Sequence, residues 1–197
     1  MKSFGITLAF AAALMALPAL AQDDANQQQQ QPQANKQMQP TDTKGIGDWT
    51  VQCYPVKSQT PCEMIEMRVS TKSRQRILAV LLAYAPAENV SLLRVAVPLG
   101  ALLQNGLIVN TDTYKSQVLK FMRCDQGGCY AQVPLNNDEV GTLGRATNAK
   151  VQVVMLDGKH YDLSFSLNGF SEAYSTMAGL AKAKATKPDA APAPAAQ

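Results

Sequence analysis

The stretch that decides the fold is KVQVVMLDGKHYDLSFSL, residues 150–167. Apolar and polar side chains alternate in both of its halves, as in strands with one buried face. The Asp157-Gly158 step between the halves is a strong signal for a two-residue type I′ hairpin turn. The period of two places one set of side chains on a single face: Tyr161, Leu163, Phe165 and Leu167. This stretch therefore predicts an antiparallel β-hairpin with one apolar side.

Strand-like runs continue upstream of this hairpin and are separated by turn residues. Seven are predicted, at 48–54, 64–71, 76–85, 91–99, 101–110, 117–124 and 127–135. The runs at 76–85 and 91–99 are almost continuously apolar, which predicts central strands covered on both faces. Asn105-Gly106 is predicted to form a second type I′ turn.

The alternation within two of these runs assigns their faces. In residues 48–54, Trp49 and Val51 share one face, and Thr50 and Gln52 share the other. In residues 64–71, we expect the apolar face to carry Ile65, Met67 and Val69, and the polar face to carry Glu66, Arg68 and Ser70.

Two segments have a helical pattern. Residues 136–147 predict one short helix capped by Asn136 or Asn137 and weakened by two glycines. Residues 170–185 predict a C-terminal amphipathic helix with Ser171 as its cap. Its stripe of Phe170, Ala173, Tyr174, Met177 and Leu180 is expected to pack on the sheet, with a partner-binding helix as the alternative.

Eight or nine short strands without β-α-β alternation predict an all-β fold, an antiparallel β-sandwich or barrel, with those two helices added. Residues 45–177 form the predicted domain, of ordinary single-domain size. The Gln-rich stretch 22–44 is predicted to be a disordered tether, and the Ala/Lys/Pro-rich stretch 178–197 a disordered tail, because neither can bury enough apolar surface.

Residues 1–21 have the pattern of a cleaved signal peptide. Lys2 precedes an apolar run from Phe4 to about Leu17, and small residues stand at Ala19 and Ala21. The run is shorter than the roughly 20 residues that span a bilayer, and no later apolar run is long enough. We therefore expect no transmembrane segment in the mature chain. The expected location is the periplasm or the exterior of a bacterial cell, with association with the outer membrane as an open alternative.

Charge is nearly balanced in the predicted domain, with twelve Lys and Arg against eleven Asp and Glu between residues 45 and 177. Nucleic-acid binding normally requires a basic stripe, and the sequence has none within this range. We expect no nucleic-acid partner. A protein or another macromolecule of the envelope or host surface is the expected partner, and the oligomeric state stays open.

The four cysteines are expected to form disulfides, because an even number in an exported domain is typical of bridges. Cys53 and Cys62 flank one turn, and Cys124 and Cys129 flank another, in CDQGGC. Local pairing closes two hairpins and is favoured, whereas crossed pairing requires the hairpins to be stacked. A redox motif has two residues between its thiols, and the only histidine is distant from both pairs, so neither redox chemistry nor zinc binding is expected.

No catalytic, cofactor-binding or metal-binding residues are predicted. His160, Asp162 and Ser164 share one strand face, but residues two apart on a strand lie about 7 Å from each other, too far for a hydrogen-bonded relay. They are expected to face solvent. The segment GALLQNG lacks the Gly-Lys-Ser/Thr ending of a phosphate-binding loop. The carboxylate pairs Asp138/Glu139 and Glu63/Glu66 are interpreted as solvated surface.

Four blocks together resemble the invasion-associated locus B (IalB) family of exported bacterial proteins. They are GDWTVQC followed by Cys62, VPLGALLQNGLIVNTD, LKFMRCDQGGCYAQVPL and LSFSLNGFSEAY, and they extend from about Gly47 to Met177. The resemblance implies an immunoglobulin-like β-sandwich in the periplasm or envelope, structural roles for the cysteines, and, in some pathogens, a link to entry into host cells. No catalytic residues accompany the family.

The sequence thus favours a non-enzymatic envelope protein that binds a macromolecule and is linked to host-cell interaction or envelope integrity. A second hypothesis is a periplasmic assembly helper that offers a sheet edge to a client strand. A hydrolase or redox enzyme is the third hypothesis.

Overall fold

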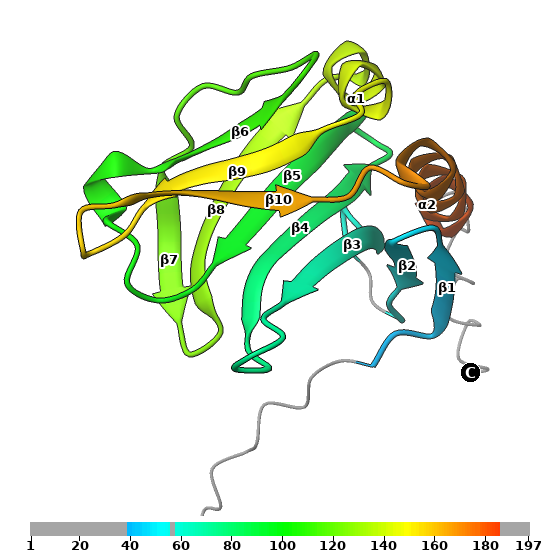
Figure 1. Cartoon of the computed structure of the whole chain (residues 1–197). Helices are drawn as coiled ribbons and strands as arrows, with labels where there is room; N and C mark the ends of the chain where they lie inside the picture. Colours follow the sequence, from blue (N-terminus) through cyan, green and yellow to red (C-terminus); the bar gives the residue numbers. More distant parts are fainter. Residues whose placement is uncertain (1–38, 56–57, 186–197) are drawn as a thin grey trace, which may run out of the picture. The chain divides into compact units, whose positions relative to one another are not determined.

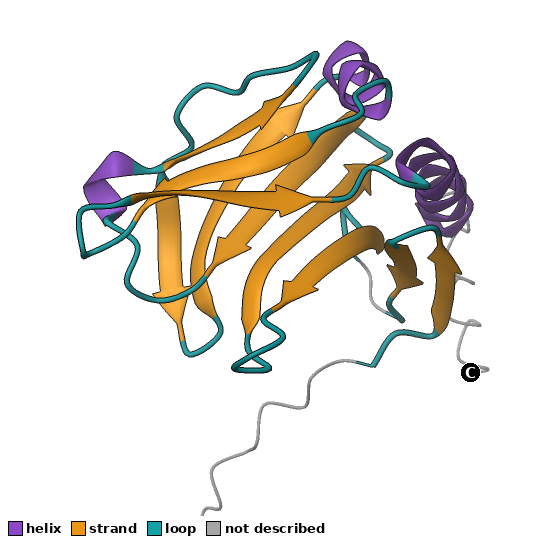
Figure 2. Cartoon of the chain, viewed as in Figure 1, coloured by secondary structure: helices purple, strands orange, loops and turns teal. Residues whose placement is uncertain are grey.

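A computed structural model describes residues 39–55 and 58–185 of the chain. Within them it has ten strands, two α-helices and one short 3-10 helix (Figures 1 and 2). The predicted signal peptide, most of the predicted tether and the last part of the predicted tail, 186–197, lie outside the described residues. None of the described helices is both long and apolar enough to cross a membrane.

Seven strands form one antiparallel sheet in the order β1-β2-β3-β4-β5-β8-β7. Their bounds are β1 Asp42–Ile46, β2 Trp49–Cys53, β3 Cys62–Val69, β4 Arg76–Ala85, β5 Val90–Val97, β7 Phe121–Asp125 and β8 Gly128–Leu135. The apolar runs form β4 and β5 in the middle of this sheet, as predicted. In Figure 1, however, the smaller sheet and both helices lie on the same side of it. Double-sided coverage is therefore not observed, although Ala79 and Ala96, which lie opposite each other on β4 and β5, are fully buried.

The remaining strands form a second antiparallel sheet in the order β10-β9-β6. Its strands are β6 Leu107–Thr111, β9 Ala149–Val154 and β10 His160–Phe165. The predicted hairpin of residues 150–167 is confirmed, with Tyr161 opposite Val153 and Phe165 opposite Ala149. Gly158 has a φ of 76°, a value that glycine adopts without steric cost.

Both predicted helices are present, but Ser171, predicted to cap the C-terminal one, lies inside it, and its hydroxyl donates to the Gly144 carbonyl at 3.3 Å. Helix α1, Asn137–Gly144, begins with Asn136 accepting a hydrogen bond from the Glu139 backbone, while the Glu139 side chain accepts one from the Asn136 backbone. Helix α2, Phe170–Ala185, buries Phe170, Ala173, Met177 and Ala181. Leu180, predicted to be part of this stripe, is 37% exposed. Ala181, which is fully buried, faces the sheet in its place.

The core fills the space between the sheets and continues beneath α2. Trp49 is 1% exposed, stacks edge-on against Phe170 at 5.3 Å between ring centroids, and donates its indole N–H to the Ser166 carbonyl. Tyr84 meets Tyr174 in the same edge-on manner. Burying such aromatic pairs stabilises both sheet-to-helix contacts. The predicted fold class, an all-β antiparallel sandwich with one short helix and a C-terminal helix, is confirmed.

Strand β3 alternates as predicted but presents the opposite face. Met64 and Glu66 are buried, whereas Met67 and Val69 are 55% and 52% exposed. The register explains the reversal, because Cys62 lies opposite Cys53, whose side chain already faces inward. With a side-chain period of two, one fixed residue determines the face of every other residue in the strand.

The predicted turn at Asn105-Gly106 is wrong. Residues Leu103–Asn105 form the 3-10 helix, and only Gly106 has a positive φ, 63°. The backbone of residues 100–102 instead bonds to the end of β9, through Leu102 N–H to the Val154 carbonyl at 2.8 Å. The tertiary contact with β9 therefore replaces the expected local hairpin.

The N-terminal end of the folded unit differs from the prediction. Strand β1 begins at Asp42, inside the stretch predicted to be a tether, because backbone pairing with β2 requires no apolar side chains. Helix α2 ends at Ala185, as the helical pattern of residues 170–185 predicts. Asp42 and Lys184 form an ion pair of 3.4 Å that joins strand β1 to the end of this helix.

Candidate functional site

The four cysteines predicted as site residues form two cross-strand disulfides in the structure. Cys53 bonds to Cys62 opposite it on β3, and Cys124 bonds to Cys129 opposite it on β8. These are the pairs that the sequence spacing favoured. Cys53 and Cys62 are fully buried, whereas Cys124 is exposed. No free cysteine exists among the described residues.

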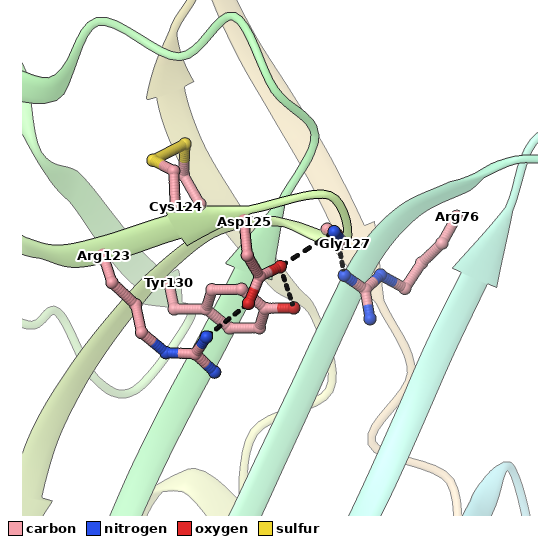
Figure 3. Close-up of a disulfide and its surroundings, with 7 residues drawn as sticks. Arg76, Arg123, Cys124, Asp125, Gly127 and Tyr130 are labelled. Atoms are coloured by element: carbon pink, nitrogen blue, oxygen red, sulfur yellow. Dashed lines mark hydrogen bonds and ion pairs between the residues drawn. A yellow bond between two sulfur atoms is a disulfide. The ribbon is translucent and has the colours of Figure 1, made fainter. Parts of the chain in front are cut away.

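Side chains around Cys124 hold the turn of CDQGGC in place (Figure 3). The Asp125 carboxylate accepts the Gly127 backbone N–H at 2.8 Å and the Tyr130 hydroxyl at 3.2 Å, and it pairs with Arg123. The Arg123 guanidinium also lies 4.3 Å from the centre of the Tyr130 ring. The Gly127 hydrogen bond is the main cause that lowers the pKa of Asp125. The carboxylate therefore serves the turn and is not placed to activate a thiol.

Glycine at the end of this turn is required by the neighbouring strand. Gly128 has a φ of 125°, and a side-chain carbon there would lie 2.2 Å from the Val97 carbonyl oxygen on β5. Arg76, from the start of β4, donates a hydrogen bond to the Gly127 carbonyl. The disulfide thus joins β7 to β8, and the contacts of Gly127 and Gly128 hold this hairpin against β4 and β5.

The residues considered for catalysis, His160, Asp162 and Ser164, all face solvent, as predicted. Asp162 accepts hydrogen bonds from Lys150 Nζ at 2.6 Å and Gln152 Nε2 at 2.9 Å, and the Lys150 bond is the main cause that lowers its pKa. Its carboxylate is therefore oriented toward β9 and does not orient His160. This arrangement is that of a surface ion pair.

Glu66 is the charged residue that the sequence reading placed wrongly. The sequence predicts solvated surface for it, yet it is 2% exposed on the inner face of β3. One carboxylate oxygen meets Arg68 Nε at 2.6 Å and the Ser166 N–H at 3.4 Å, and the other has no hydrogen-bond partner among the described residues. Burial is the main cause that raises its pKa. No local pattern distinguishes Glu66 from an exposed glutamate; only the inward position of Cys62 indicates its face.

The other carboxylates of those pairs lie nearer to solvent. Glu63, on the outer face of β3, is half-buried and accepts hydrogen bonds from Gln52 and from the Tyr54 hydroxyl, both at 2.8 Å. Burial, then the hydrogen bond to Glu63, raises the pKa of Tyr54 to about 12. In the first turn of α1, Asp138 is exposed, as predicted, and Glu139 is half-buried.

An apolar groove of about 470 Å³ opens between the two sheets at the end that carries the β9–β10 turn. Sequence reasoning missed it, because it combines residues from three distant segments: Ile77, Pro98, Gly100, Val153, Met155, Leu156, Asp157, Tyr161 and Leu163. Leu99 beside it and Leu156 on its rim are 57% and 71% exposed. We name this region the open end. Volumes of this size are typical of ligand-binding clefts.

Two other grooves, both more polar than that of the open end, lie elsewhere on the molecule. One, of about 470 Å³, shares Pro98 with the open end and is lined by Arg76 and Gln126. The other, of about 360 Å³, surrounds Asp112, whose pKa is lowered chiefly by the hydrogen bond from the Thr147 hydroxyl. No group of three or more His, Cys, Asp or Glu side chains within residues 39–55 and 58–185 is arranged to hold a metal ion.

The fold and this surface define a class of protein: an antiparallel two-sheet sandwich with a helix closing one end and an apolar groove at the other. Residues 49–178 match the family model described as Invasion associated locus B (IalB) protein. The chain belongs to this family, as the sequence blocks indicated.

Known relatives agree with this assignment. Two Brucella abortus proteins named invasion protein B homolog, from strain 2308 and from biovar 1 strain 9-941, are each 29% identical to the chain over 136 residues. The alignments cover 68% of this chain and 78% of each relative. The crystal structure of invasion associated protein b from Bartonella henselae has a similar fold. Its TM-score is 0.63 at 22% identity, over 72% of this chain and 99% of that one.

Proposed function

We propose that this protein is exported to the periplasm or the cell exterior and acts by binding another macromolecule, without catalysing a reaction. The observation that carries the proposal is the open end. Leu156 and Tyr161 expose apolar surface there, at 71% and 40%, beside a groove with apolar walls. Exposed apolar surface that adjoins a groove is typical of interaction sites.

Two further observations support export and binding. Cross-strand disulfides are stable in oxidising compartments such as the periplasm and are rare in the cytosol. The Brucella and Bartonella relatives carry names that refer to invasion. We infer that the binding contributes to contact with a host cell or to the integrity of the envelope. A second candidate, an assembly helper that pairs with a client strand, is favoured by the open edge of β10.

The test is binding of the full exported chain to outer-membrane vesicles of the source bacterium and to cultured host cells. Leu156→Ser removes apolar surface at the open end, and we expect it to weaken binding about tenfold. Val118→Ser is the matched control, because Val118 is 55% exposed and lies outside the groove. Equal binding by the two variants would refute the open end as the binding surface.

A further inference from the structure

We propose that the outer edge of β10, together with the groove of the open end, binds an extended segment of a partner polypeptide as an added strand. The inference rests on the proposed binding function and specifies its surface and partner. It is carried by four observations: the direction of the backbone groups of β10, the state of the other sheet edges, the side chains next to the edge, and the space beyond it.

One hydrogen bond just beyond β9 shows which backbone groups of β10 point outward. Met155 N–H donates to the Lys159 carbonyl at 3.0 Å. The odd-numbered residues of this hairpin therefore direct their backbone N–H and C=O groups toward the opposite strand. Because alternate residues of a strand direct their N–H and C=O to opposite sides, His160, Asp162 and Ser164 direct theirs away from β9. Among the described residues, none donates to or accepts from the backbone groups of these three.

Each of the other sheet edges is protected. Strand β1 carries Asp42 and Lys44 on a short edge. Strand β7 is interrupted by a bulge between Phe121 and Arg123. The edge of β6 is occupied by the segment 114–119, through two backbone hydrogen bonds between Leu107 and Leu119 at 2.9 and 2.8 Å.

Charges, bulges and covering segments are the usual means of preventing strand addition. Strand β10 is regular, with each of its six residues in register with β9. Among the described edges it is therefore the one best prepared to accept another strand.

The side chains that alternate with these free groups point into the groove. Tyr161 and Leu163 line it together with Ile77 of β4 and Met155 beyond β9. A strand added to β10 would direct every second side chain to this same side of the sheet. Main-chain bonds would supply affinity and the groove would select apolar side chains at alternate positions, as in known β-augmentation complexes.

The large sheet determines what can occupy this edge. Strand β10 packs over β3 and β4, and the sheet continues beyond them with β2 and β1 (Figure 1). A second copy that paired its own β10 here, in an antiparallel manner, would bring its β1, β2 and β3 into the same space. A single extended segment carries no second sheet, so it can pair with β10 without this overlap. The occupant is therefore a strand of a partner polypeptide and not the same edge of a second copy.

The first test uses the unmodified full chain and a ten-residue peptide in which threonine and valine alternate between two lysine pairs. With valine side chains in the groove, an antiparallel added strand directs its threonine N–H groups to β10. N-methylation of the threonines should weaken binding at least about tenfold, and N-methylation of the valines should change it less than about twofold. The reverse pattern supports parallel addition. Equal affinity of both methylated peptides, or no binding of the parent peptide, would overturn the proposal.

The second test alters the edge itself. Ser164→Pro removes an outward N–H while leaving the β9 ladder intact, and Ser164→Ala is the matched control that keeps the N–H. We expect about tenfold weaker peptide binding for the proline variant alone. Equal peptide binding by the two variants would refute the β10 edge as the binding site. Dimerisation of the wild-type chain that Ser164→Pro abolishes would identify a second copy as the occupant. Vesicle or cell binding that persists when peptide binding fails would refute this inference while the proposed function stands.

Discussion

The two ends of the sandwich differ in how they use apolar surface. At one end, which we name the closed end, α2 covers Trp49 and buries its own Met177, which are 1% and 0% exposed, and the Cys53–Cys62 disulfide is fully buried. At the open end, Leu156 and Tyr161 remain 71% and 40% exposed, and no described helix covers the groove. Strand β10 connects the two ends, running from the β9–β10 turn toward α2 (Figure 1).

The comparison separates stability from binding. Apolar atoms removed from water stabilise the fold by about 25 cal/mol per Å², whereas exposed ones contribute only when a partner covers them. Substitutions at the closed end should therefore change the free energy of unfolding, and those at the open end should change affinity. The four predictions that follow test this separation, from the largest expected effect to the smallest.

Trp49→Ala should lower the free energy of unfolding by about 3–5 kcal/mol, because it removes a fully buried ring and the hydrogen bond to Ser166. Urea denaturation followed by circular dichroism measures this change. Trp49→Phe is the control, since it keeps a ring beside Phe170 and should cost less. A loss below about 1 kcal/mol for the alanine variant would contradict the assigned role of the closed end.

The two disulfides should differ in cost and in reactivity. Their loops are short, with sequence separations of 9 and 5, and the chain-entropy estimate is about 2–3 kcal/mol for each. Replacing Cys53 and Cys62 with alanine should cost about 1 kcal/mol more than replacing Cys124 and Cys129, because it removes two fully buried side chains, whereas Cys124 of the other pair is exposed.

Reduction should begin at the Cys124–Cys129 bridge, since a reducing thiolate reaches the exposed Cys124 sulfur without unfolding of the protein. Alkylation and mass spectrometry after brief treatment with dithiothreitol should find Cys124 and Cys129 labelled first. Simultaneous labelling of all four cysteines, or faster labelling of Cys53, would contradict the difference between the two sites.

Glu66→Gln should stabilise the protein by about 1 kcal/mol at pH 7, because it removes a buried charge whose second oxygen has no described partner. The folded-state pKa of Glu66 lies above its ordinary value, so the folded state holds the proton more tightly than the unfolded state. The contribution of Glu66 to the free energy of unfolding is therefore most favourable below the unfolded pKa of about 4.5. It becomes less favourable as the pH rises through the folded pKa.

Denaturation at several pH values measures the effect, and the advantage of Glu66→Gln should shrink as the pH falls from 7 toward 4. Glu63→Gln is the matched control for removing a carboxylate from the outer face of the same strand. An advantage that grows on acidification would have the wrong sign and would contradict burial of the charge.

Leu156→Ser should change the melting temperature least, because the side chain is 71% exposed and contributes less than about 0.5 kcal/mol to stability. Differential scanning calorimetry measures the shift. Its predicted effect on binding is large, as described for the proposed function. A strongly lowered melting temperature would show that the open end contributes to stability, and the comparison between the two ends would then fail.

Much of the fold is predictable because local patterns agree with the tertiary structure. The hairpin around Asp157-Gly158 combines a turn signal with two alternating halves, and the Asn136 cap combines with Glu139 three residues later. Where only one local signal was present, prediction failed. Asn105-Gly106 has the residues of a turn, but the preceding segment is held by β9 instead.

The candidate surface is less predictable, because non-local pairing creates it. The face of Glu66 depends on the register between Cys53 and Cys62, and the groove joins Ile77 to Tyr161 across both sheets. Strand β1 was missed because its pairing uses backbone groups and its side chains are mostly polar. Periodicity indicates that a strand has two faces; it does not indicate which edge will remain open.

The most direct test of the account is amide hydrogen exchange of the full chain with and without the threonine-valine peptide. The account predicts slower exchange at His160, Asp162 and Ser164 and unchanged exchange along β1. Slower exchange along β1 or β7 with no change in β10 would contradict it.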